Sequence, residues 1–185
     1  MSTLATAPSA ISTWNLDAAH SVAEFKVKHM MISNVKGQFT KLTGTLKFDE
    51  QDITNSAVEA SIDAGSIHTR DAQRDAHLKS ADFFDVEKFP ALTFKSTAIT
   101  RKSDDELAVA GDLTIHGVTR KIVFAVEGPT PSAKDPWGNT RLGLSATARI
   151  NRKDYGLTWN AALETGGILV GDEITITLDV QFVKA

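Results

Sequence analysis

The sequence predicts an all-β fold, an eight-stranded antiparallel barrel with one short helical insertion around residues 69–85. The first observation is period-two alternation: residues 21–29, SVAEFKVKH, carry apolar side chains at every second position and mostly charged ones between them. Such alternation is typical of a strand with one buried and one solvated face. The second observation is that residues 106–115 and 171–184 alternate in the same way. The third is that a helical period is sustained only around residues 69–80.

Five further segments are rich in Val, Ile, Thr and Phe, the residues that favour strands. They are residues 38–48, 56–64, 90–99, 119–127 and 139–150. The tetrapeptide HGVT, His116 to Thr119, predicts a tight turn and therefore a hairpin between 106–115 and 119–127. Residues 128–139 hold three of the five prolines and are expected to form a long exposed loop.

This series of strands predicts either a sandwich or a closed barrel. Short connections favour the up-and-down barrel, and closure also leaves no unpaired edge strand. We expect residues 13–185 to form this single domain and residues 1–12 to form a flexible tail. In the helical segment, Thr69 is expected to cap the N-terminus, with Asp71 in the first turn.

The composition argues against several classes of protein. With 20 basic and 23 acidic residues the net charge is −3, which argues against nucleic acid as a partner. The absence of cysteine excludes disulfides and cysteine-bound metals. No run of 18 apolar residues occurs, so an integral membrane protein is not expected. The N-terminus lacks a signal-peptide pattern, which predicts a cytoplasmic location as written, or a periplasmic one if the natural N-terminus has been replaced.

The sequence shows no pattern typical of a metal site or of an enzyme. None of the five histidines has the spacing that presents two imidazoles to one metal ion. No nucleophile elbow and no glycine-rich phosphate loop is present. We therefore expect no metal, no catalytic residue and no cofactor other than a bound lipid.

A barrel of eight strands is either filled by its own side chains or holds one small ligand. The inward positions mix bulky with small residues. The bulky ones are Phe25, Met31, Phe39, Phe48, Phe94, Leu113 and Ile115, and the small ones are Ala23, Gly44, Ala60, Gly111 and Ala146. Small residues among large ones could leave a tube, but a solid core fits the pattern equally well.

Five segments occur in order and together closely resemble the YceI-like family of polyisoprenoid-binding proteins. They are DAAHSVAEFKVKHM, VKGQFTKLTGTLKFD, SIHTRDAQRDAHLKSADFFDVEKFPALTFKST, GDLTIHGVT and INRKDYGL. The resemblance runs from about Trp14 to Phe182. It implies a lipocalin-like barrel with a helical insertion, an elongated apolar tunnel for an isoprenoid or similar amphiphile, and a homodimer.

The resemblance also gives a set of candidate residues. The candidate tunnel lining consists of Phe25, Val27, His29, Met31, Phe39, Leu46, Phe48, Phe83, Phe84, Phe94, Leu113, Ile115 and Trp159. In the segment RDAHLKSADFFD, Arg74, Asp75 and His77 are expected to connect the helix to the barrel mouth by hydrogen bonds. The alternative is that Arg74 or His77 contacts a ligand headgroup.

Three functions follow from these observations. The leading one is a carrier or storage protein for a long apolar ligand: a polyisoprenoid, a quinone-like molecule or another amphiphilic lipid. The second is an enzyme that acts on such a lipid, with His77 or His29 as general base. The third is a dimeric, stress-related scaffold with a solid core.

Overall fold

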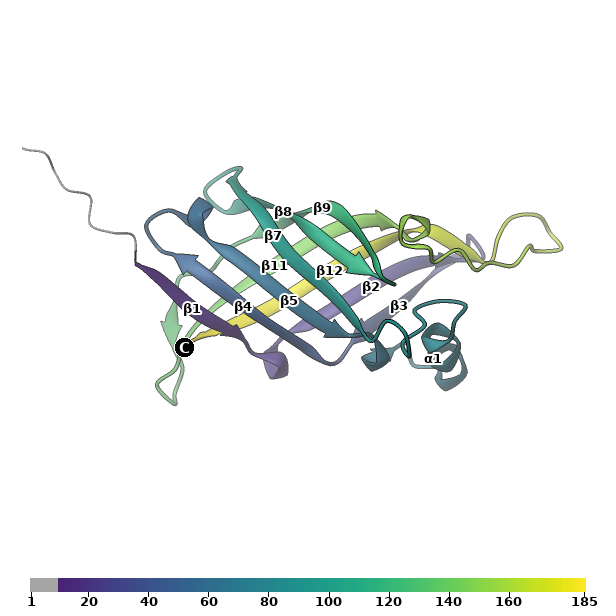
Figure 1. The fold of residues 1–185 in the computed structure, drawn as a ribbon, viewed down its shortest axis with the longest axis horizontal. Coiled ribbons are helices and arrows are strands. Elements are labelled where there is room, and N and C mark those ends of the chain that lie inside the picture. Colours follow the sequence, from purple (N-terminus) through teal and green to yellow (C-terminus); the bar gives the residue numbers. More distant parts are fainter. Residues whose placement is uncertain (1–9) are drawn as a thin grey trace, which may run out of the picture.

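Eight antiparallel strands form a closed ring in the computed structural model, which describes residues 10–185 (Figure 1). Around the ring they are β11 (Thr140–Asn151), β9 (Val118–Glu127), β8 (Glu106–Ile115), β7 (Ala91–Arg101), β5 (Ala57–Asp63), β4 (Leu42–Asp49), β1 (Ile11–Leu16) and β12 (Val170–Lys184). Pairing of β12 with β11 along its second edge closes the sheet. The predicted eight-stranded antiparallel barrel is confirmed.

Three strands of the ring are each joined at a bend to a further strand. The additional strands are β2 (Val22–His29), β3 (Ser33–Phe39) and β6 (Ile67–His68). Along one edge, β12 pairs first with β2 and then with β1, while β3 pairs with both β2 and β6. Therefore β1–β2, β3–β4 and β5–β6 each act as one long, bent strand. This elongates the barrel on one side.

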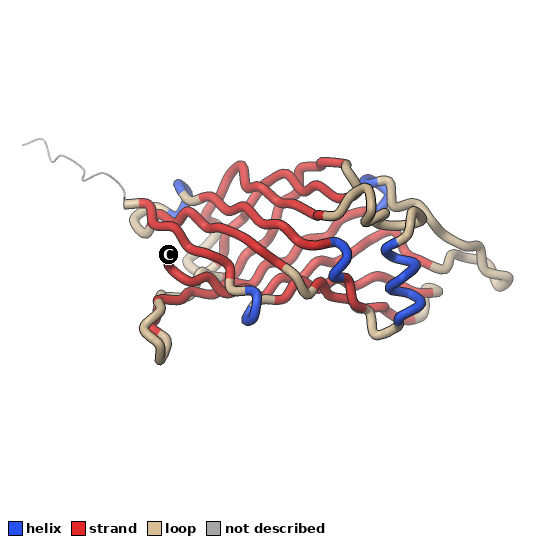
Figure 2. Tube along the Cα trace, turned by 60° about the horizontal axis from the view of Figure 1, so that its bottom comes forward, coloured by secondary structure: helices blue, strands red, loops and turns tan. Residues whose placement is uncertain are grey.

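Short helices lie at the bends and ends of the barrel (Figure 2). They are η1 (Ala18–His20), η2 (Ile53–Asn55), η3 (Ala64–Ser66), α1 (Ala72–Lys79) and η4 (Arg152–Tyr155). The predicted helical insertion is confirmed as α1, which lies across one end of the barrel (Figure 1). Its N-cap is Asp71, whose side chain accepts from the Arg74 N–H, so the predicted Thr69 cap is wrong. None of the helices formed by residues 10–185 has the length and apolar character needed to cross a membrane.

The predicted hairpin is present as β8 and β9. Its two-residue turn consists of His116 and Gly117, both with positive φ (54° and 72°). This conformation matches the right-handed twist of the flanking strands. The predicted loop at 128–139 contains the two-residue strand β10 (Ala133–Lys134), which pairs with β11.

Besides the two-residue strands β6 and β10, two strands were not predicted, β1 and β3. The strand β1 begins at Ile11, within the segment expected to be a tail, while residues 1–9 of that segment lie outside the described residues. In β3 the inward positions are Val35, Gly37 and Phe39, and the central glycine weakens the apolar alternation. Both strands depend on contacts from distant parts of the chain.

The bend between β1 and β2 is held by a two-carboxylate ion cluster. Arg141 of β11 forms ion pairs with Asp17, the N-cap of η1, and with Asp135 in the β10–β11 turn. The guanidinium lowers the pKa of both carboxyl groups to about 2, and His20 contributes to the shift at Asp17. Both carboxylates therefore stay charged at neutral pH, and the cluster connects the bend to β11.

The apolar core is divided into three clusters along the barrel wall. The first, at the α1 end, contains Phe39, Ile115 and Tyr155. The second contains Ile99, Phe124 and Val126. The third, at the end that holds the C-terminus, contains the fully buried Trp14 with Leu142 and Phe182. The side chains thus form a lining around the barrel axis.

Two inward aromatic rings lie directly over glycines of neighbouring strands. A Cβ added at Gly37 would approach the Phe25 ring to 2.3 Å, and one added at Gly111 would approach the Phe94 ring to 2.5 Å. These distances are far shorter than any van der Waals contact. The missing Cβ at each glycine gives the aromatic ring the space to lie against the wall.

We predict that Gly111→Ala destabilises the barrel by about 2 kcal/mol or more, because the new methyl group overlaps both the Phe94 ring and the Lys95 carbonyl oxygen. Urea unfolding followed by circular dichroism measures this free energy. Gly143→Ala is the matched control, because a Cβ there meets nothing closer than 3.6 Å. Equal stability of the two variants would contradict the packing described here.

Candidate functional site

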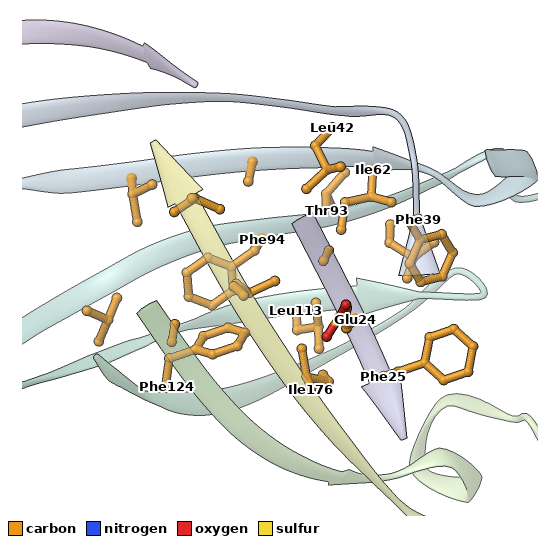
Figure 3. A pocket seen from close by; sticks show the side chains of 18 of the residues that line it. Glu24, Phe25, Phe39, Leu42, Ile62, Thr93, Phe94, Leu113, Phe124 and Ile176 are labelled. Carbon is orange, nitrogen blue, oxygen red and sulfur yellow. The ribbon is translucent and has the colours of Figure 1, made fainter. Parts of the chain in front are cut away.

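A cavity of about 250 Å³ runs along the inside of the barrel (Figure 3). Val170 and Phe182 both line it and are twelve positions apart on β12. At about 3.3 Å per residue and a strand tilt near 40°, this separation corresponds to about 30 Å along the barrel axis. Native cores rarely contain voids larger than a water molecule, so the interior is not the solid core of the third hypothesis.

Ten of the thirteen predicted lining residues contact this cavity. They are Phe25, Val27, Phe39, Leu46, Phe48, Phe83, Phe84, Phe94, Leu113 and Ile115. In Figure 3, Phe94 and Phe124 lie side by side; their ring centroids are 5.1 Å apart and the rings are nearly perpendicular. Whether these residues bind a ligand remains a prediction.

Three predicted lining residues lie elsewhere. His29 is the last residue of β2 and Met31 lies beyond it in the β2–β3 turn, where its side chain is exposed. Trp159 packs against Phe83 and His77, outside the cavity wall. All three lie at or beyond the end of a regular element, where strand alternation no longer determines the direction of a side chain.

Of the five small inward residues, three contribute to the cavity and two do not. Ala23, Ala60 and Ala146 line the cavity. The space over Gly111 is filled by Phe94, and Gly44 does not contact the cavity. The idea that small residues leave a tube is therefore correct for the alanines only.

The cavity is apolar over nearly its whole surface. Further lining residues that were not among the candidates include Ile62, Leu92, Phe124, Ile176 and Leu178. The alternation of β5, β7, β9 and β12 could have identified them, because each occupies an inward position of a strand. Glu24 also belongs to the wall, but it lies between the inward residues Ala23 and Phe25 on β2 and is exposed.

Residues of α1 and the turn that follows it cover one end of the cavity. Leu78, Phe83 and Phe84 all line it. The Phe84 ring packs edge-on against Phe39 of β3, with centroids 5.9 Å apart. The aromatic pair of the RDAHLKSADFFD segment therefore points inward and forms this end of the cavity.

Arg74 and Asp75 connect α1 to the barrel through Thr69, the buried residue that follows β6. The Thr69 hydroxyl accepts from Arg74 Nε at 2.8 Å and donates to Asp75 Oδ1 at 2.5 Å. The Thr69 carbonyl accepts from Arg74 Nη2, and its N–H donates to Asp75. The two charged side chains thus meet on one threonine, and this arrangement corresponds to the predicted connection between helix and barrel.

His77 does not take part in the connection through Thr69, so the prediction is wrong for this residue. Its Nε2 lies 2.8 Å from Asp82 Oδ2, and its ring packs edge-on against Phe83 and Trp159. It does not line the cavity. The contacts of His77 orient the turn that carries Phe83.

Arg152 is a buried cation of the cavity wall that the sequence analysis did not identify. The side chain is 2% exposed and donates to the carbonyl oxygens of Leu157, Trp159, Val170 and Gly171. Asp172 is the nearest carboxylate, at 3.8 Å. Burial lowers the pKa of Arg152, while the Asp172 charge opposes that shift. Arg152 therefore holds the 157–171 segment against the barrel and places a positive charge at the α1 end of an otherwise apolar wall.

Tyr155 is the second buried ionisable side chain of this region. Burial, together with the charge of Asp154, raises its pKa to about 12. The phenol is therefore neutral at physiological pH and packs as part of the first core cluster. Within residues 10–185, no group of three or more His, Asp or Glu side chains is arranged to hold a metal ion.

Comparison with known proteins agrees with this geometry. The YceI-like domain family matches residues 14–182. A UPF0312 protein of Staphylococcus aureus (strain N315) is 37% identical over 172 residues, covering 93% of this chain and 98% of the relative. This chain belongs to the YceI-like family.

Solved structures share the same barrel. The Campylobacter jejuni YceI protein has a TM-score of 0.71 and 29% identity, with 86% of this chain and 91% of that chain covered. BcnA of Burkholderia cenocepacia has a TM-score of 0.77 and 23% identity, with 90% and 98% covered. A polyisoprenoid binding domain from Saccharophagus degradans has a TM-score of 0.68 and 15% identity, with 95% and 100% covered.

We predict that Thr69→Val destabilises the protein by about 1–3 kcal/mol, because it leaves Arg74 Nε and Asp75 without their hydroxyl partner in a partly buried position. Thr119→Val is the matched control, since its hydroxyl bonds only to Thr114 on an exposed face. Chemical unfolding of both variants provides the comparison. A Thr69 variant as stable as the control would show that this connection contributes nothing to stability.

Proposed function

We propose that this protein binds one long-chain amphiphile, such as a polyisoprenoid or a quinone-like lipid, inside the barrel and carries or stores it. The observation that supports this proposal most strongly is the cavity, which follows the barrel for about 30 Å and is lined almost entirely by apolar side chains. A compact polar metabolite would leave its polar groups unpaired along such a wall.

The energy of binding would come from burial of the chain. Each methylene group removed from water contributes about 0.8 kcal/mol before the costs of ordering the ligand. A long chain therefore needs few polar contacts. The Saccharophagus degradans neighbour is described as a polyisoprenoid binding domain, and the apolar, elongated cavity of this chain would suit a ligand of that type.

The polar end of the ligand is proposed to lie near Arg152. Arg152 lines the cavity, although its guanidinium also donates to four backbone carbonyls, whereas Arg74 and His77 do not line the cavity and bond to Thr69 and Asp82. The contacts of Arg74 and His77 favour structural roles over the headgroup alternative. No cofactor besides the lipid itself is needed for this function.

The catalytic hypothesis has one observation in its favour, the carboxylate beside His77. An imidazole with a carboxylate partner is a common general base. However, His77 does not contact the cavity, and its ring packs against Phe83 and Trp159 outside the cavity wall. We therefore propose a binding protein, which returns its lipid chemically unchanged. A homodimer in the cytoplasm or the periplasm remains part of this proposal.

We predict that Phe94→Asp abolishes retention of the bound lipid, because it places a charge at the middle of the apolar wall. Lipid is measured by mass spectrometry of an organic extract, per mole of protein shown to be folded by circular dichroism. Val123→Asp is the control, since Val123 precedes the lining residue Phe124 on β9 but is itself 58% exposed. Full retention in folded Phe94→Asp protein would refute the proposed site.

A further inference from the structure

Three consecutive apolar side chains are exposed at the tip of the β2–β3 turn. Met30, Met31 and Ile32 are 38%, 62% and 79% exposed. They form the end of a hairpin that projects at the α1 end of the barrel (Figure 1). Exposed apolar clusters of this kind usually mark a surface that contacts another protein or a membrane.

The turn places two large side chains at positions where the backbone φ is positive, which is unfavourable for such residues. Met30 and Met31 have φ values of 52° and 59°, and the Ile32 N–H donates to the His29 carbonyl to close the turn. A β-turn whose two central residues both have positive φ favours Asn and Gly at those positions, because a residue with a Cβ is disfavoured in the left-handed conformation. The chain therefore carries two large apolar residues where turn geometry alone favours Asn-Gly, which indicates a role other than folding.

Three lysines lie on the outer face of the same hairpin. Lys26 of β2 is directly opposite Lys36 of β3, and Lys28 is two residues further towards the tip. Six other lysines of residues 10–185 form ion pairs with carboxylates, whereas these three, like Lys47, Lys79, Lys102 and Lys134, form none. Like charges placed opposite each other repel. Glu24 is the one acidic residue of the hairpin, so the hairpin carries a net positive charge behind its apolar tip although the chain is acidic as a whole.

The tip also adjoins residues that line the cavity. Val27 lines the cavity, and His29 at the end of β2 pairs with Val170, another lining residue. The Met30 N–H donates to the Leu169 carbonyl in the segment held by Arg152. Only Lys28 and His29 therefore separate the exposed turn from the lining residue Val27.

We propose that the β2–β3 hairpin docks on a lipid membrane with anionic headgroups. Met30, Met31 and Ile32 insert between the lipids, and Lys26, Lys28 and Lys36 contact the phosphates. Apolar residues next to lysines are the combination that anionic bilayers bind. The hairpin thus brings one end of the cavity to the surface from which a lipid would be taken. This last point rests on the proposed function, whereas the docking itself does not.

Cosedimentation with vesicles tests the proposal without any cargo lipid. Wild-type protein should bind vesicles of equal parts phosphatidylglycerol and phosphatidylcholine, and bind weakly to phosphatidylcholine alone or in high salt. Each Lys→Gln change at positions 26, 28 or 36 should lower the partition coefficient about fivefold. The double variant Met31→Ser, Ile32→Ser should lower it by about tenfold or more.

Two further variants separate docking from folding. Met30→Asn with Met31→Gly relieves the strained turn, so the protein should be at least as stable as wild type but bind vesicles less. Trp137→Ser is the control for exposed apolar area, because Trp137 is 81% exposed in the β10–β11 turn at the opposite end of the barrel (Figure 1). It should bind vesicles like wild type.

Three results would overturn the proposal. The first is wild-type protein that stays in solution with anionic vesicles, and the second is a set of hairpin variants that bind as well as wild type. The third is a dimer in light scattering that the Met30 and Met31 changes convert to a monomer, which would assign this surface to a second copy of the chain. None of these results affects lipid retention by the Phe94 variants, so docking and cargo binding fail independently.

Discussion

Closure of the sheet by β12 is the constraint on which the rest of the structure depends. This strand pairs with β11 along one edge, from Arg141 opposite Val183 to Asn151 opposite Glu173, and with β1 and β2 along the other. Since both edges are occupied, the ring holds its diameter and its inward side chains cannot collapse onto a second sheet. They instead form a wall around an axis, and the core is divided into three clusters around a long cavity.

The two ends of this wall differ in chemistry. The end with the C-terminus is packed by Trp14, Phe48 and their neighbours in the third core cluster. The other end is covered by α1 and its two phenylalanines, carries the buried Arg152 and is adjacent to the exposed methionine turn. The buried cation and the surface that we propose to face the membrane therefore lie at the same end of the barrel. We expect the ligand to enter and leave at this end.

The sequence could predict the barrel because strands that bury one face must alternate, and most of these strands do. The strand β3 was missed since Gly37 occupies an inward position to leave room for Phe25, a pairing that no local pattern contains. The same limit applies to the site. Eight of the ten correct lining residues follow from strand alternation, and Phe83 and Phe84 follow from the family resemblance. Met31 lies in a turn whose positive φ values point it away from the cavity. Arg152 is missed because its partners are carbonyls of a distant segment, which only the folded chain brings to it.

The central claim is that the barrel holds a long-chain lipid, and mass spectrometry of an organic extract from freshly purified protein tests it most directly. The account predicts about one isoprenoid, quinone-like or related chain per barrel, released on denaturation and absent from an equally treated Phe94→Asp control. A blank extract, from protein that also fails to take up an added polyprenol, would contradict it.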